Sequence, residues 1–155
     1  MGVEIERKFL VDHEKWEQLP KPEGTHYRQG YILSNKEQTV RVRVSDKKAY
    51  INLKSKVSDI SRKEYEYEIP LEDGVEILNE FTKNGTKKTR YRIPFDGKTW
   101  EIDVFEGDND GLIVAELELQ SESEEFRRPD WVTTEVTDEG KYTNASLAVN
   151  PFSKW

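Results

Sequence analysis

The chain has 155 residues, of which 34% are hydrophobic and 35% are charged, and its formal net charge is −7. The length predicts a single domain over residues 1–155, and four Trp, seven Tyr and six Phe argue against a disordered chain. The negative charge disfavours non-specific binding of nucleic acid or of an anionic membrane, so we expect neither partner.

Features of export are missing from the sequence. There is no cysteine, which excludes disulfides and thiolate metal sites. The N-terminus has neither the basic start nor the apolar core of a signal peptide, and no apolar run approaches the roughly 20 residues needed to span a bilayer. We therefore expect a cytoplasmic protein.

The first half of the chain is predicted to be mostly strand. Residue patterns predict a strand over 3–11, a short helix from the N-cap Asp12 to Trp16, and strands over 27–33, 39–45, 49–56 and 62–69. Pro20, Pro22 and Gly24 end the helix. Residues 46–48 form a short turn, so the strands on either side of it should pair as a hairpin.

The second half alternates helices with strands. Val75, Leu78 and Phe81 have helical spacing within a predicted helix over 71–83, which Asn84-Gly85 should stop. Strands over 87–94 and 98–105 should form a hairpin across 95–97, followed by a strand over 113–119. A helix over 121–126, capped by Ser121 and Glu124, and a last helix over 137–149 complete the prediction.

The expected fold class is mainly β (α+β). Hairpin connections imply antiparallel pairing. Because closure of a sheet removes its exposed edges, we expect an eight-stranded antiparallel closed barrel with short helices packed outside.

Charged residues recur at every second position of the predicted strands, so they share one face of the sheet. Three strands carry only basic residues on this face and two carry only acidic ones. The positive set is Lys8, Arg41, Arg43, Lys54, Lys56, Arg62, Lys88, Arg90 and Arg92. The negative set is Glu4, Glu6, Glu64, Glu66, Glu68, Glu101, Asp103, Glu116 and Glu118.

The simplest interpretation of this pattern is the solvated face of an ordinary antiparallel sheet. Like charges on neighbouring positions are destabilising, however, unless a ligand neutralises them. A polyphosphate would neutralise the basic rows and a divalent cation the acidic rows. Oxygen ligands favour Mg²⁺ or Mn²⁺ over zinc, and the chain has no phosphate-binding loop of the G-x-x-x-x-G-K-[ST] type.

The run Glu4-Ile5-Glu6-Arg7-Lys8 resembles the E-x-E-x-K signature of the CYTH superfamily, the triphosphate tunnel metalloenzymes. Further segments match the pattern of that superfamily in order. They are 28–31 (RQGY), 41–43 (RVR), 53–54 (LK), 62–66 (RKEYE), 88–91 (KTRY), 101–105 (EIDVF), 116–118 (ELE), 131–137 and 142–148. The resemblance covers essentially the whole chain.

The resemblance implies roles for individual residues. It implies metal ligands at Glu4, Glu6, Asp103, Glu116 and Glu118, and phosphate binders at Lys8, Arg41, Arg43, Lys54, Arg62, Lys88, Arg90 and Lys141. Glu64 and Glu66, with Arg62, would form tunnel wall that contacts phosphate or orients water. Tyr31 matches a tyrosine considered catalytic, although a tyrosine that packs in the strand fits at least as well. The cofactor would be Mg²⁺ or Mn²⁺ and the partner a small-molecule triphosphate, and we expect that the chain can form a homodimer.

Activities in this superfamily include hydrolysis of inorganic, thiamine, RNA and nucleoside triphosphates, and class IV adenylate cyclase. The compact chain is most similar to short bacterial members that cleave the terminal phosphate of inorganic tripolyphosphate, with nucleoside triphosphates as further candidate substrates. Two alternatives stay open: a class IV-type adenylate cyclase, and a non-catalytic module that binds polyphosphate or nucleotide.

Overall fold

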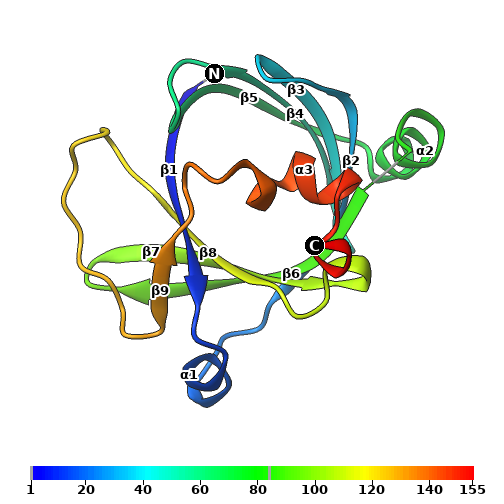
Figure 1. The fold of residues 1–155 in the computed structure, drawn as a ribbon. Helices are drawn as coiled ribbons and strands as arrows, with labels where there is room; N and C mark the ends of the chain where they lie inside the picture. The colour runs from blue at the N-terminus through cyan, green and yellow to red at the C-terminus, as the bar shows by residue number, and fades with distance from the viewer. Residues whose placement is uncertain (1, 84) are drawn as a thin grey trace.

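The computed structural model describes residues 2–83 and 85–155 (Figure 1). Its strands are β1 (Gly2–Val11), β2 (Thr25–Ser34), β3 (Gln38–Val44), β4 (Ala49–Lys56), β5 (Ser61–Ile69), β6 (Gly85–Phe95), β7 (Lys98–Glu106), β8 (Ile113–Glu118) and β9 (Val132–Glu135). Its α-helices are α1 (His13–Gln18), α2 (Leu71–Phe81) and α3 (Asn144–Val149), with short 3₁₀ turns at Gly107–Asn109, Gly140–Tyr142 and Phe152–Lys154.

Eight strands form a closed antiparallel ring in the order β5-β4-β3-β2-β6-β7-β8-β1, and β1 pairs back with β5 to close it. Figure 1 looks into this ring along its axis. The ninth strand, β9, adds to β1 beside the ring. The predicted eight-stranded closed antiparallel arrangement is confirmed.

The tight turn between β6 and β7 fixes the register of the hairpin that carries five of the lumen's charged residues. Asp96 and Gly97 both have positive φ, 50° and 76°. Two such residues make the turn whose twist matches that of the flanking strands. The register that follows places Arg90 opposite Asp103 and Arg92 opposite Glu101.

An aromatic core lies outside the ring, against β1, β6, β7 and β8. Phe9 and Trp100 are completely buried there, and Trp16 of α1 and Trp131 pack onto them. The helix α1 begins as predicted, because the Asp12 side chain accepts a hydrogen bond from Lys15 N. This core holds the outward side chains of the strands, which leaves their charged side chains to face inward.

The helix α2 covers another part of the outer surface, over β3 and β4. Val42, Val44 and Ala49 are buried beneath it together with Leu78. Gly74 allows this close approach, because a Cβ at that position would lie 2.2 Å from the Ala49 Cβ. The helix is two residues shorter than predicted, and Asn84 of the predicted stop signal lies outside the described residues.

The helix α3 departs from the prediction that the helices pack outside. It lies across the opening of the ring in Figure 1, and its residues line the same cavity as the inward side chains of β1 and β4. Leu147 is buried with Phe105 and Val114, both on inward positions of their strands. Apolar contacts at the end of the lumen therefore anchor this short helix. The periodicity of nearby residues cannot predict these contacts, because they join segments far apart in the chain.

Two further predictions need correction, and one strand was missed. Residues 121–126 form a turn and extended chain, although Glu124 does reach back to accept a hydrogen bond from Gln120 N at 2.6 Å. The helix expected over 137–149 is confined to Asn144–Val149. The strand β9 was not predicted, because its four residues are too few to show the alternation that is typical of a strand. In the described part of the chain, no helix is long and apolar enough to cross a membrane.

Candidate active site

The interior of the ring is lined by the charged residues that the alternation placed on one face. Cross-strand pairing brings Glu6 opposite Glu118, Lys8 opposite Glu116 and Lys54 opposite Glu64. The polar face is therefore the inside of a closed ring and not a solvated outer face. The interpretation as an ordinary solvated sheet face is wrong for this chain.

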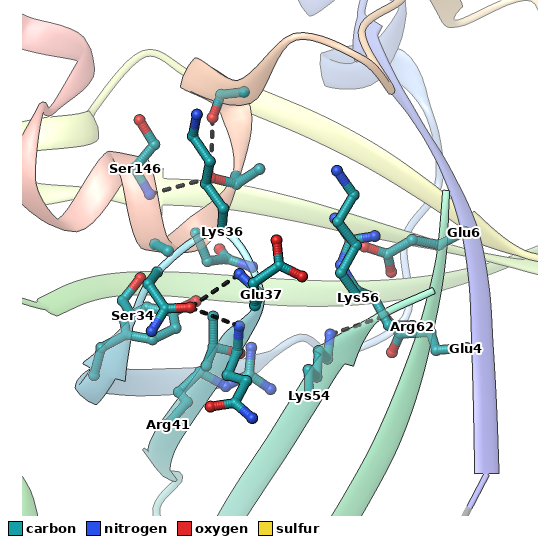
Figure 2. A pocket seen from close by; sticks show the side chains of 18 of the residues that line it. Glu4, Glu6, Ser34, Lys36, Glu37, Arg41, Lys54, Lys56, Arg62 and Ser146 are labelled. Carbon is teal, nitrogen blue, oxygen red and sulfur yellow. Dashed lines mark hydrogen bonds and ion pairs between the residues drawn. The ribbon is translucent and has the colours of Figure 1, made fainter. Parts of the chain in front are cut away.

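A cavity of about 540 Å³ occupies this interior (Figure 2). Its wall carries Glu4, Glu6, Lys8, Tyr31, Arg41, Asn52, Lys54, Lys56 and Arg62 from the strands, and Thr143, Asn144 and Ser146 from the α3 region. The loop between β2 and β3 adds Ser34 to Gln38 at the rim. Most of the wall is thus charged or polar, as an anionic ligand requires.

Arg41 is a buried cation without a protein counter-ion. Its residue is 7% exposed and its Nε has no hydrogen-bond partner. Among the described residues no carboxylate lies within 4.0 Å of its guanidinium. Because burying an uncompensated charge is costly, this group fits an anion bound in the cavity.

Arg43 lies farther along the same strand and is held by aromatic rings. Its guanidinium carbon lies 4.6 Å from the ring centre of Tyr27 and 5.4 Å from that of Tyr50. Its Nη2 lies 3.7 Å from Glu66. Burial, together with neighbouring Arg41, lowers the pKa of Arg43. Two adjacent cations on one strand thus create a strong positive potential beside the cavity.

Lys54 and Lys8 link the basic and acidic parts of the lumen. Lys54 Nζ donates to Glu4 Oε1 at 2.8 Å and lies 3.8 Å from Glu64. Burial opposes the charged form of Lys54, but Glu6 and Glu4 outweigh it and raise its pKa. Lys8 Nζ lies 3.6 Å from Glu116, and there too the carboxylates Glu116 and Glu6 overcome burial and raise the pKa of the lysine. Both lysines are therefore charged at neutral pH.

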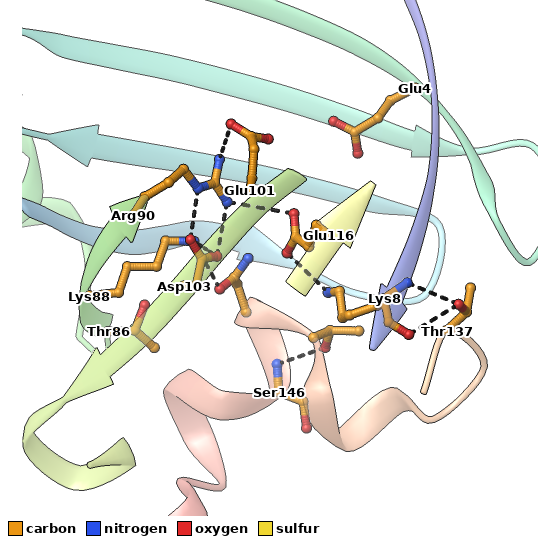
Figure 3. Close-up of polar contacts among 12 residues, drawn as sticks. Glu4, Lys8, Thr86, Lys88, Arg90, Glu101, Asp103, Glu116, Thr137 and Ser146 are labelled. Atoms are coloured by element: carbon orange, nitrogen blue, oxygen red, sulfur yellow. Dashed lines mark hydrogen bonds and ion pairs between the residues drawn. The ribbon is translucent and has the colours of Figure 1, made fainter. Parts of the chain in front are cut away.

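Asp103 forms the deepest ion cluster of the lumen (Figure 3). One of its oxygens accepts from Arg90 Nε at 2.7 Å, and the other accepts from Lys88 Nζ at 2.7 Å and Arg90 Nη2 at 2.9 Å. Burial raises the pKa of Asp103, but the two cations outweigh it and hold that pKa well below its ordinary value. Burial lowers the pKa of Lys88 to about 8, and the positive charge of nearby Arg90 lowers it further, although Asp103 opposes the shift. Both oxygens of Asp103 are thus engaged by cations.

The acidic residues gather on β1, β5 and β8. Burial raises the pKa of Glu4, with a further contribution from Glu64, although Lys54 opposes it. Burial and then Glu4 and Glu64 raise the pKa of Glu118. This mutual repulsion of carboxylates is what a divalent cation would relieve. Within residues 2–83 and 85–155, no three acidic or histidine side chains already stand in a metal-holding arrangement.

The other predicted residues have different surroundings. Tyr31 lines the cavity beside Arg41, its cross-strand partner. Arg62 lines the cavity but donates to the carbonyl oxygens of Ser58 and Ser61 at 2.7 and 3.1 Å. Lys141 is exposed and its Nζ lies 4.4 Å from the ring centre of Trp155. The ring wall therefore contains every predicted residue except Lys141.

Several lumen residues were missed by the sequence reasoning. Asn52 is 1% exposed, lines the cavity, and lies two positions before Lys54 on the same inward face. The alternation that placed Lys54 on the inner face also places Asn52 there. Its amide is uncharged, so an interpretation based on charged residues did not include it. Thr143, Asn144 and Ser146 come from α3 and carry no strand alternation, so the sequence held no comparable signal for them.

Comparisons with known proteins agree with this geometry. The model of the CYTH domain family matches residues 2–147. An inorganic triphosphatase of Acetivibrio thermocellus is 45% identical over 100% of this chain and 99% of its own, and one of Nitrosomonas europaea is 33% identical over 96% and 98%. A crystal structure of an inorganic triphosphatase with 32% identity covers 96% of each chain with a TM-score of 0.66. The chain belongs to the CYTH domain family.

Proposed function

We propose that this protein hydrolyses the terminal phosphoanhydride bond of inorganic tripolyphosphate with the help of a divalent metal ion. The observation that carries the proposal is the buried, unpaired guanidinium of Arg41 on the wall of the 540 Å³ cavity. Two relatives similar over nearly the full chain are named inorganic triphosphatase, which supports the same reaction.

The basic residues would bind the phosphoryl oxygens and stabilise charge that builds up as the bond breaks. Arg41, Lys54 and Lys8 line the cavity, and Arg43, Lys88 and Arg90 lie around it on neighbouring strands. Arg62 would contribute at the wall. Lys141 would need to leave Trp155 to contribute, so it is the weakest member of the predicted set.

The carboxylates supply the hard oxygen ligands that Mg²⁺ and Mn²⁺ prefer. The raised pKa values of Glu4 and Glu118 fit a cation site, and Glu6 and Glu116 are cross-strand partners of Glu118 and Lys8. Asp103 belongs to the proposed metal set, but with both oxygens engaged its contribution would be to hold Lys88 and Arg90. A bound metal would polarise a phosphoryl oxygen and activate water.

Three groups would act on the attacking water or beside it. Glu64 and Glu66 lie on the inward face of β5 and would orient the water, since oriented attack dominates phosphoryl transfer. Tyr31 lies on the cavity wall and would either donate to a phosphoryl oxygen or support Arg41 by packing. Among the described residues that line the cavity, Tyr31 is the one aromatic residue. The wall therefore has no pair of aromatic rings between which a nucleobase could stack.

Phosphate release tests the proposal. Purified protein is incubated with tripolyphosphate or ATP and Mg²⁺ or Mn²⁺, and we expect faster release from tripolyphosphate and none with chelator. No release from either substrate would refute hydrolysis. Cyclic AMP and pyrophosphate from ATP would identify a cyclase, and tight binding without product a binding module.

The remaining expectations from the sequence form part of this proposal. They are a single domain over residues 1–155, a cytoplasmic location and the ability to form a homodimer. Sedimentation of the purified chain at several concentrations tests the last of them.

A further inference from the structure

Asn52 joins two carboxylates of the neighbouring strand. Its Nδ2 donates to Glu64 Oε2 at 2.9 Å and to Glu66 Oε2 at 3.0 Å. Asn52 is 1% exposed, and Glu66 is its direct cross-strand partner. We call Asn52 with these two carboxylates the amide bridge.

The amide bridge opposes a repulsion that the sequence builds into β5. Glu64 and Glu66 are two residues apart, so their side chains share one face of the strand. Their side chains are 28% and 33% exposed. Each carboxylate has one weak ion pair: Lys54 lies 3.8 Å from Glu64, and Arg43 lies 3.7 Å from Glu66. Without the shared donor, two like charges would have no common contact to hold them together.

The amide orientation follows from the chemistry of its partners. Both partners are carboxylates, which only accept hydrogen bonds, so the nitrogen and not the oxygen of Asn52 must face them. The two N–H groups of the amide are both used by this contact. Asn52 lines the cavity, while its other cross-strand partner is Arg41, the unpaired cation of the site.

We propose that Asn52 is a positioning residue for the hydrolytic reaction, holding Glu64 and Glu66 together where they orient the attacking water. This inference rests on the proposed function, because it assigns Asn52 a part in the same site. Asn52 acts through the two carboxylates, so its removal should slow the reaction more than it weakens substrate binding.

Two substitutions test this role. Asn52→Asp keeps the shape but replaces the donor with a third carboxylate, and Asn52→Leu removes the amide at similar volume. We expect each to lower kcat for tripolyphosphate by about 10- to 100-fold, as loss of hydrogen bonds to charged groups predicts, with KM changed less than about threefold. Asn79→Leu makes the same change on the exposed side of α2 and should leave both constants unaltered.

A measurement on the protein without substrate checks the bridge itself. In a nitrogen-15 NMR spectrum, both side-chain amide protons of Asn52 should be shifted downfield. Glu66→Leu should return one of them towards the free value and leave the other. Two unshifted amide protons would overturn the amide bridge even if Asn52→Leu failed to fold.

The kinetic outcomes separate this inference from the proposed function. Wild-type protein that releases no phosphate under any divalent ion would overturn the function. Active wild-type protein with unchanged kcat in Asn52→Leu would overturn only the role of Asn52. A rise in KM at constant kcat would also overturn it, because it would make Asn52 a substrate-binding residue.

Discussion

Two buried guanidinium groups of the lumen, Arg41 and Arg90, differ in what neutralises them. Arg90 contacts Asp103 through two nitrogens and lies 3.5 Å from Glu116, whereas Arg41 has no such partner within the described chain. Folding energy and ligand binding therefore depend on different residues of the same wall. Breaking a buried ion pair strongly destabilises the folded protein. A buried charge without a partner also destabilises it, so removing such a charge does not.

Arg41→Met and Arg90→Met should have different effects on the free energy of unfolding. We expect Arg90→Met to lower it by about 3–5 kcal/mol, since Asp103 loses a partner in a buried site. Arg41→Met should leave it unchanged or raise it, yet raise KM for tripolyphosphate at least about tenfold. Urea unfolding without polyanion and steady-state kinetics measure the two quantities. Equal destabilisation by both substitutions would contradict the assignment of Arg41 as a ligand-neutralised cation.

Glu135 ties β9 to β1 and gives that contact a pH dependence. Arg7 donates to it through Nε at 2.7 Å and Nη2 at 2.6 Å, and these bonds lower the pKa of Glu135. A carboxyl whose pKa is lowered in the folded state stabilises above its unfolded pKa, and this contribution is lost as the pH falls through the folded pKa.

Glu135→Gln should therefore destabilise at neutral pH and not in acid. We expect a loss of about 1 kcal/mol near pH 7, modest because the pair is partly exposed. The difference from wild type should shrink as the pH falls below the ordinary glutamate value of 4.5. Unfolding in urea at a series of pH values measures it, with Glu125→Gln on the exposed loop as the matched control. A difference that stays constant with pH would contradict the ionic origin.

At the scale of elements, α2 shows how tertiary contact overrides local propensity. Alanine is a better helix former than glycine by about 1 kcal/mol, and Gly74 lies inside the helix. The 2.2 Å separation that a Cβ would have from Ala49 reverses that preference, because the helix must move away from the sheet.

Gly74→Ala should lower the free energy of unfolding by about 1–3 kcal/mol. Asn79→Ala, at an exposed position of the same helix, should be neutral or slightly stabilising. Thermal unfolding of both variants measures the two changes in stability. If Gly74→Ala were as stable as Asn79→Ala, α2 would not be seated on β3 and β4 as closely as described.

For the whole molecule, a closed ring with basic and acidic rows on its inner face couples folding to anion binding. The inner cations repel one another, and a polyanion in the cavity removes that repulsion. The outer helix α2 carries Glu72, Asp73, Glu76 and Glu80, all exposed. Anions are thus attracted to the basic rows inside the ring and not to the outer face of α2.

Tripolyphosphate should raise the melting temperature in the presence of chelator, where turnover is not expected. At 100 times its dissociation constant it should add about 2.7 kcal/mol, or about 5–10 °C for a domain of this size. Differential scanning calorimetry measures the shift, and Arg41→Met should remove most of it. An unaltered melting temperature at millimolar tripolyphosphate would mean that the lumen does not bind the anion in the metal-free state.

Local sequence information was sufficient for the eight strands of the ring, their antiparallel pairing and the inward direction of the charges. Hairpin turns such as Asp96-Gly97 and the strict alternation of Arg41, Arg43, Lys54 and Arg90 are properties of a few neighbouring residues, so they can be predicted without tertiary structure. Together with the resemblance of the E-x-E-x-K run, they were enough to predict a closed ring with a charged interior.

Which charges neutralise one another, and which do not, depends on how distant strands pair in the folded chain. Arg41 and Arg90 look alike in the sequence, but the register gives Arg90 a partner and leaves Arg41 to the cavity. The position of α3 across the opening of the ring and the contact of Asn52 with two carboxylates also depend on distances between segments far apart in the chain. Side-chain alternation fixes the face on which a residue lies, whereas its partner is set by packing across the closed ring.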